Sequence, residues 1–208
     1  MANKVIKILL IGLIVLLIAF LGFKYSWRLF DDKDELITFS LRVENTKNIP
    51  DSLMDIYTTV YPHHINKSTI QEIVIGYGSN ILAGVVKDYD NCFCDEIIRD
   101  ELFGYKKYPK ALIRRFQSLR LSFGLESLVE ENKCLNYYLI KEYEEVNRNN
   151  SSYAYTWANK TIFELTKLEF IEFLAIRNAP RYYNKFLNKD NYNRSMNFIE
   201  NKIKNASL

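Results

Sequence analysis

The sequence has little of what marks several specialised protein classes. Its 208 residues include only three cysteines and two histidines, and no repeat or low-complexity linker divides them. Three cysteines are too few for a disulfide framework, and a C-x-C pair without clustered histidines is a weak metal-binding pattern. Charges of both signs are mixed along the chain, which leaves a net charge of +3 and no basic arm for nucleic acid. We expect one domain of ordinary size plus an anchor, with no cofactor, no metal and no nucleic-acid partner.

The cysteines are Cys92, Cys94 and Cys134, and none of them is placed for lipidation. In an exported domain, either Cys94 or Cys92 could form a disulfide with Cys134. One thiol would then be left over.

An apolar run near the N-terminus predicts a membrane anchor. The run extends from Ile8 to Phe23, near the short end of the roughly 17–25 residues that cross a hydrocarbon core. Aromatic residues suited to the headgroup region follow it, namely Tyr25 and Trp27. No small-residue A-x-A cleavage site is present. We predict an uncleaved signal anchor in residues 1–30, with the N-terminus inside the cell; a cleaved signal peptide is the alternative.

The rest of the chain predicts a mainly α-helical domain. Residues 31–48 are interpreted as a juxtamembrane spacer with one short strand, because apolar and polar residues alternate from Ile37 to Val43. Asp51 or Ser52 is expected to cap a short helix that ends before Pro62. Further helices are expected over residues 95–103, 109–128, 131–145 and 191–204. A polar break is expected over 147–152, either a helix or a strand over 68–75, and a loop over 76–84.

The segment 165–183 predicts a buried central helix. Thr166 and Glu169 fit a capping box, and Leu165 and Phe170 fit the hydrophobic staple around it. Apolar side chains then occupy most of the circumference, which is typical of a helix buried on all sides. A proline near the end of the segment stops the helix.

This segment and its flanks resemble the closing part of the peptidoglycan glycosyltransferase domain, glycosyltransferase family 51, which includes the monofunctional biosynthetic transglycosylases. The family pattern is roughly F-G-K-x-x-x-x-L-[ST]-x-x-E-x-A-x-L-A, then A-P-x-x-Y and an Arg-led last helix. The matching positions are Lys160, Leu165, Thr166, Glu169, Leu174, Ala175, Ala179, Pro180, Tyr183 and Arg194. The resemblance implies a lysozyme-like domain over residues 49–208, on the outer or periplasmic face of a bacterial cytoplasmic (inner) membrane.

The resemblance also implies a chemistry that joins lipid-linked disaccharide units. In the family a carboxylate acts as general base, and cationic groups hold the pyrophosphate through charge-assisted hydrogen bonds. Tyr61 stands where the Glu of the family's E-D-x-x-F-x-x-H-x-G motif belongs, and a tyrosine is a poor base at neutral pH. The R-K-x-x-E motif falls on residues 114–118, where Ser118 replaces the carboxylate. Arg114 and Arg115 keep the basic pair and are the candidate phosphate ligands, with a solvated helix face as the alternative.

Both expected carboxylates are thus replaced, which suggests a catalytically degenerate member. Asp55, Glu72 and His64 are nearby groups that could act as a base in a shifted alignment. Three hypotheses follow. The first is a non-catalytic protein that binds lipid-linked precursor, a glycan strand or a cell-wall synthase, and the second is a divergent active glycosyltransferase. The third is an envelope scaffold or assembly component with only fold-level likeness.

Overall fold

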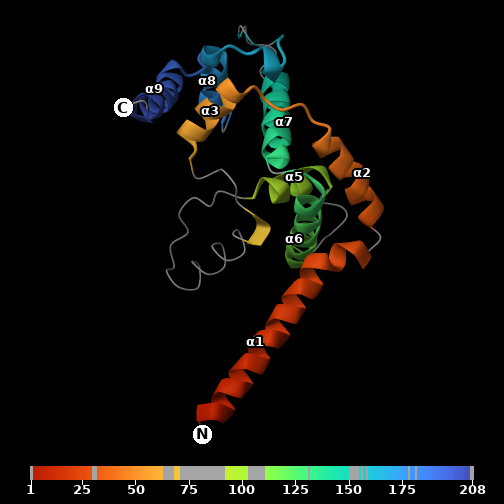
Figure 1. Ribbon diagram of the computed structural model, residues 1–208. Coiled ribbons are helices and arrows are strands. Elements are labelled where there is room, and N and C mark those ends of the chain that lie inside the picture. Colours follow the sequence, from red (N-terminus) through yellow and green to blue (C-terminus); the bar gives the residue numbers. More distant parts are fainter. Residues whose placement is uncertain are drawn as a thin grey trace. The chain divides into compact units, whose positions relative to one another are not determined.

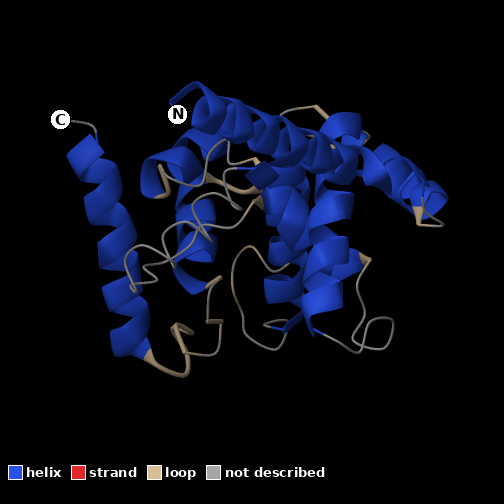
Figure 2. Cartoon of the chain, turned by 90° about the horizontal axis from the view of Figure 1, so that it is seen from below, coloured by secondary structure: helices blue, strands red, loops and turns tan. Residues whose placement is uncertain are grey.

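The computed structural model consists of helices and their connections. It describes residues 2–29, 32–62, 68–70, 92–102, 111–130, 132–149, 155, 157, 159–177, 179–180 and 182–206. Every regular element in these ranges is helical and none is a strand (Figure 2), so the predicted mainly α-helical class is confirmed. The chain divides into two compact units. Unit 1 comprises Met1–Asn45 and Ser68–Glu131, and unit 2 comprises Thr46–Lys67 and Asn132–Leu208.

Helix α6 (Ala111–Leu128) lies at the centre of unit 1, and it is the long helix predicted over 109–128. Its residues 118–125 are all buried, because neighbours cover it on several sides. These neighbours are α1 (Ala2–Tyr25), η1 (Ser26–Leu29), α2 (Lys33–Glu44) and α5 (Phe93–Glu101), which Figure 1 shows around α6.

Helix α1 combines an exposed apolar part with an end that belongs to the core of unit 1. The segment Lys4–Leu29 contains an 18-residue stretch with a mean hydropathy of 3.0. It is long and apolar enough to cross a membrane, which fits a signal anchor or a signal sequence. Farther along, Trp27 of η1 is only 4% exposed. A Cβ on Gly124 of α6 would lie 2.9 Å from the Trp27 ring, so the indole packs against the α6 backbone where only glycine leaves room.

The strand predicted over Ile37–Val43 is wrong, because these residues form part of α2. Leu36, Phe39 and Val43 are buried at spacings of three and four residues, which is the period of a helix face. The alternation predicts that Leu41 is buried on one face of a strand, but its side chain is 58% exposed. Contact with α6 selects the helical period over the two-residue period.

Unit 2 is built around the predicted central helix, α8 (Lys167–Ile176). It packs against α3 (Asp51–Val60) and α9 (Lys189–Ala206), and these two also contact each other (Figure 1). Unit 2 also contains α7 (Lys133–Asn149) and the short η2 (Ile162–Glu164).

The predicted start and burial of α8 are confirmed. The Glu169 N–H donates to Thr166 Oγ1, and the Thr166 N–H donates to Glu169 Oε2, which completes the capping box. Residues 170–176 are all buried, and the helix ends at Ile176, before the proline. Leu168 is the exception to the apolar, buried circumference, since it is 72% exposed.

The other predicted helices are present, with small differences at their ends. Helices α5, α7 and α9 correspond to those predicted over 95–103, 131–145 and 191–204, and α7 continues to Asn149, into the predicted polar break. Neither Asp51 nor Ser52 caps α3, because Pro50 takes the cap position and no side chain bonds there. Of residues 68–75 only 68–70 are described, with 69–70 helical, and 76–84 lie outside the described residues.

The cap of α8 predicts a measurable dependence of stability on pH. Hydrogen bonds from Lys160 Nζ (2.6 Å) and the Thr166 N–H lower the pKa of Glu169 to about 2. A carboxylate with a depressed pKa stabilises the fold above its unfolded pKa, about 4.3, and this contribution is lost as the pH falls toward 2. We expect Glu169→Gln to flatten the loss of stability between pH 4.5 and 2, by about 1 kcal/mol for a partly solvated pair. Thermal unfolding across this range tests it, and equal slopes for Glu169→Gln and the exposed-site control Glu200→Gln would contradict it.

Candidate functional site

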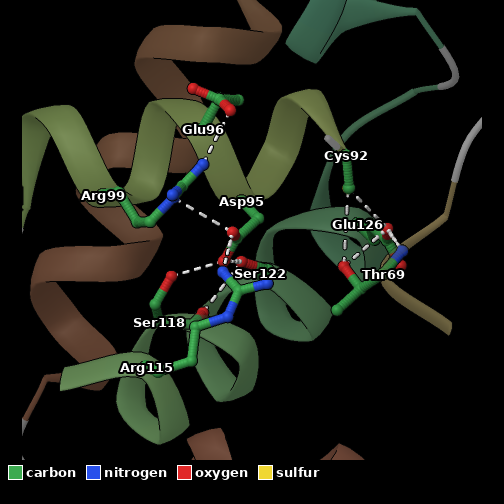
Figure 3. A network of polar contacts seen from close by, with 9 residues as sticks. All are labelled: Thr69, Cys92, Asp95, Glu96, Arg99, Arg115, Ser118, Ser122 and Glu126. Atoms are coloured by element: carbon green, nitrogen blue, oxygen red, sulfur yellow. Dashed lines mark hydrogen bonds and ion pairs between the residues drawn. The ribbon is translucent and has the colours of Figure 1, made fainter. Parts of the chain in front are cut away.

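A buried carboxylate, Asp95 of α5, collects polar groups from α6 in unit 1 (Figure 3). Arg115, Ser118 and Ser122 lie on one face of α6 because they are three and four residues apart. The Asp95 side chain is fully buried, and it forms an ion pair with Arg115 and accepts a hydrogen bond from the Ser118 hydroxyl. The Ser122 hydroxyl donates to the same oxygen as Ser118, over 3.0 Å. Arg99, which like Asp95 belongs to α5, places its Nε 3.1 Å from Asp95 Oδ2.

A second carboxylate, Glu126, lies on α6 one helical turn after Ser122. Glu126 accepts hydrogen bonds from Thr69 Oγ1 (2.8 Å) and Cys92 Sγ (3.3 Å), as Figure 3 shows. Cys92 is the free cysteine, whereas Cys94 and Cys134 are each disulfide-bonded. This state matches the predicted alternative in which Cys94 is oxidised. The Cys92, Cys94 and Glu126 donor atoms lie within 4.8 Å of one another, but a sulfur in a disulfide offers no thiolate to a metal.

The Cys92 thiol is expected to be unreactive in the folded protein. Burial, followed by the negative charge of Glu126, raises its pKa to about 12, so almost no thiolate is present at pH 8. We expect alkylation by iodoacetamide to be at least about tenfold slower in the native protein than in urea. Mass spectrometry of peptides that contain Cys92 measures both rates, and equal rates would contradict the buried position.

The predicted site residues lie in different environments. Arg115 and Ser118 belong to the Asp95 network, and neighbouring Arg114 is half-buried on α6. Asp55 is exposed on α3 in unit 2. Glu72 and His64 lie outside the described residues.

Tyr61, predicted from the family motif to stand at the position of the base, belongs to a cluster of aromatic rings around Arg177 in unit 2. The guanidinium of Arg177 lies 4.7 Å from the centre of the Tyr61 ring and 5.4 Å from that of Tyr57. Arg177 is 8% exposed, and its Nη1 forms an ion pair with Glu142 Oε2 at 2.7 Å. The Tyr138 hydroxyl donates to the other oxygen of Glu142. The Tyr61 ring therefore covers a buried ion pair.

Sequence reasoning missed another buried carboxylate, Glu172 of α8. It is 8% exposed, and it accepts hydrogen bonds from Trp157 Nε1 (2.7 Å), Lys185 Nζ (2.8 Å) and the Tyr192 hydroxyl (2.9 Å). Burial, followed by the hydrogen bond to Glu172, raises the Tyr192 pKa. A glutamate within the apolar run of α8 is the sequence signal that could have identified it, because a buried carboxylate needs partners.

Two open clefts lie apart from these clusters. One, of about 420 Å³, lies in unit 1 between α2 and α5. The other, of about 360 Å³, lies in unit 2 and is lined by residues of α9 and of the turn before it, including Tyr182, Arg194 and Phe198. Asp55, Arg114 and Arg115 line neither cleft. The predicted site residues that the structure describes thus form no concave site with these clefts.

No known protein family, curated protein sequence or solved structure matches this chain. The structure defines a mainly helical protein with an N-terminal apolar helix that could be a membrane span or a signal.

Proposed function

We propose that the protein is a membrane-anchored, catalytically inactive relative of the peptidoglycan glycosyltransferases in a bacterial envelope. It binds lipid-linked precursor, a glycan strand or a cell-wall synthase, and residues 49–208 form its lysozyme-like domain. The family motifs support the relationship, and the surroundings of Ser118 support the loss of catalysis.

The environment of Ser118 is the observation that carries the proposal. The second family carboxylate would stand at this position, and here the side chain is fully buried and donates to Asp95. Arg115 forms an ion pair with the same carboxylate. At the position of the first carboxylate, the Tyr61 ring covers Arg177. Side chains at the reactive positions of the family thus contact structural groups of this chain.

Helix α1 and the oxidised cysteines support two further parts of the proposal, a retained anchor and its orientation in the membrane. Helix α1 has the length and hydropathy of a span, and η1, directly after it, contributes the buried Trp27 to unit 1. This favours a retained anchor over a cleaved signal. Cys94 and Cys134 are disulfide-bonded, and disulfides persist in oxidising compartments. The disulfide-bonded cysteines thus support a folded part outside the cytoplasm.

The test uses the full-length protein in detergent with labelled lipid-linked disaccharide. We expect saturable binding and no polymer. Arg114→Ala is the informative variant, because Arg115→Ala would also remove a partner of the buried Asp95. It should weaken binding at least about fivefold, as loss of a charge-assisted contact implies, whereas Arg148→Ala on α7 serves as the control and should not.

The other outcomes contradict parts of the proposal. Polymer that disappears with Asp55→Asn, Glu72→Gln or His64→Gln would overturn the loss of catalysis and identify the base. Neither polymer nor binding of precursor, glycan strand or synthase would overturn the binding role. That result would favour an envelope scaffold with only fold-level likeness.

A further inference from the structure

We propose that α6 lies along the surface of the bilayer that α1 crosses, with Ile113 and Phe116 inserted at the boundary of the acyl chains. The occupant of this apolar surface is phospholipid. The inference rests on one part of the proposed function, that α1 spans the membrane.

The charges in α1 place its last turns at the membrane boundary. A span of about 20 residues covers a hydrocarbon core of about 30 Å, and such a span ending at Phe23 begins at Lys4. Lys7 then lies in the first turn of the span, where its long side chain extends to the headgroups. Moving the span toward the C-terminus would bury Lys24 and Arg28 in hydrocarbon, which is unfavourable. Phe20 and Phe23 therefore lie in the last turn of the span, just inside the headgroup region.

Ring contacts bring α6 to the same depth. The ring centres of Phe23 and Phe116 are 4.4 Å apart, and the Phe123 ring lies 6.1 Å from Phe23 and 6.0 Å from Phe20. Phe116 and Phe123 are two helical turns apart, about 10 Å along the axis, yet both meet Phe23. Helix α6 thus crosses the end of α1 instead of running beside it, and it lies roughly in the plane of the membrane surface.

The exposure of α6 identifies the side that faces lipid. Ile113 is 47% exposed and Phe116 is 56% exposed, three residues apart on one face, whereas residues 118–125 are buried within unit 1. Phe116 packs on Phe23 of α1, and Leu21, two residues earlier in the same helix, is 42% exposed. Lipid that surrounds the exposed side chains of α1 therefore reaches Phe116 at the same depth.

The side chains that flank this boundary suit an interfacial position. Tyr25 is 45% exposed, and the guanidinium of Arg28 lies 5.3 Å from its ring centre. Aromatic rings and long cations at the end of a span occupy the headgroup level. Unit 1 is thus attached to the bilayer at two points, which fixes its orientation to the membrane.

A photo-crosslinking side chain, benzoylphenylalanine, tests the depth of α6 in the full-length protein. It replaces Phe116, and in separate variants Ile113, Leu16 of α1 or Leu41 of α2. Leu41 is the matched control, because it is 58% exposed and lies about 12 Å along α2, which leads away from the end of α1 (Figure 1). The variants are irradiated in vesicles of phosphatidylethanolamine and phosphatidylglycerol, and adducts are identified by mass spectrometry.

We expect lipid adducts at positions 16, 113 and 116, with a yield at 116 at least about fivefold above that at 41. Adducts at position 16 but not at 113 or 116 would overturn the placement of α6 and leave the anchor intact. No lipid adduct at position 16 would instead overturn the membrane-spanning anchor. Protein adducts at 113 and 116 would show that another chain, and not lipid, covers this surface. Replacing Phe116 removes its ring contact with Phe23 and could prevent folding. In that case the adducts at position 113, which is 47% exposed, decide the result.

Discussion

Asp95→Ala is expected to lower the free energy of unfolding of unit 1 by about 3–5 kcal/mol, because it breaks a buried ion pair and leaves its partners behind. Arg115 would lose its buried counter-charge, and the Ser118 hydroxyl would lose its acceptor inside the core. The Ser122 hydroxyl would keep the Ser118 carbonyl as an acceptor, at 2.8 Å. Unsatisfied buried donors add the cost of their lost hydration. Ser118→Ala, which removes only one donor, should cost about 1 kcal/mol.

Urea unfolding in detergent, followed by circular dichroism and by alkylation of Cys92, measures this effect within unit 1. Asp55→Ala is the matched control, since Asp55 is exposed on α3 and its side chain makes no hydrogen bond that the structure describes. The control should change the free energy by no more than about 0.5 kcal/mol. Equal effects of the two substitutions would show that the Asp95 network does not stabilise unit 1.

Removal of residues 2–29 is expected to unfold unit 1, whereas removal of residues 2–18 is not. The longer deletion takes away Trp27, which is 4% exposed against α6, together with the rings of Phe20 and Phe23. Loss of one large buried aromatic side chain typically costs about 3–5 kcal/mol, which is a large part of the stability of a small unit. The shorter deletion removes only side chains that are exposed in the described part of α1.

Both deletion variants are compared with the full chain in the same detergent, through hydrogen exchange of α6. We expect α6 amides to remain protected without residues 2–18 and to lose protection without residues 2–29. Trp27→Ala in the full chain separates loss of the side chain from loss of the segment, and it should weaken protection in part. Full protection after the longer deletion would show that unit 1 folds independently of its N-terminal segment.

Local signals in the sequence were sufficient where one element determines the structure. The capping box of Thr166 and Glu169 predicted the start of α8, because both groups lie within one helical turn. Apolar side chains at helical spacing predicted α6, although Ile113 and Phe116 of that pattern are exposed. The same reasoning failed for α2, where the exposed Leu41 contributed to the alternation that predicted a strand. The apolar side chains buried there are Leu36, Phe39 and Val43, at helical spacing.

The partners of the buried carboxylates could not be predicted, because they come from elsewhere in the chain. Arg115 is twenty residues from Asp95 in the sequence, and nothing near either residue indicates their ion pair. Arg115 was therefore interpreted through the family motif as a phosphate ligand. Glu172 is similar, since its partners Lys185 and Tyr192 follow after a turn that the local pattern does not define.

The central claim is that α1 remains in the mature protein and anchors it, because unit 1 needs the end of this helix for its core. The most direct measurement is the intact mass of the full chain, produced in a bacterium with a C-terminal tag and extracted from the membrane fraction. We expect a mass that includes residues 2–29. A mature protein that begins after Trp27 would contradict the claim, since its folded part would then exist without the anchor.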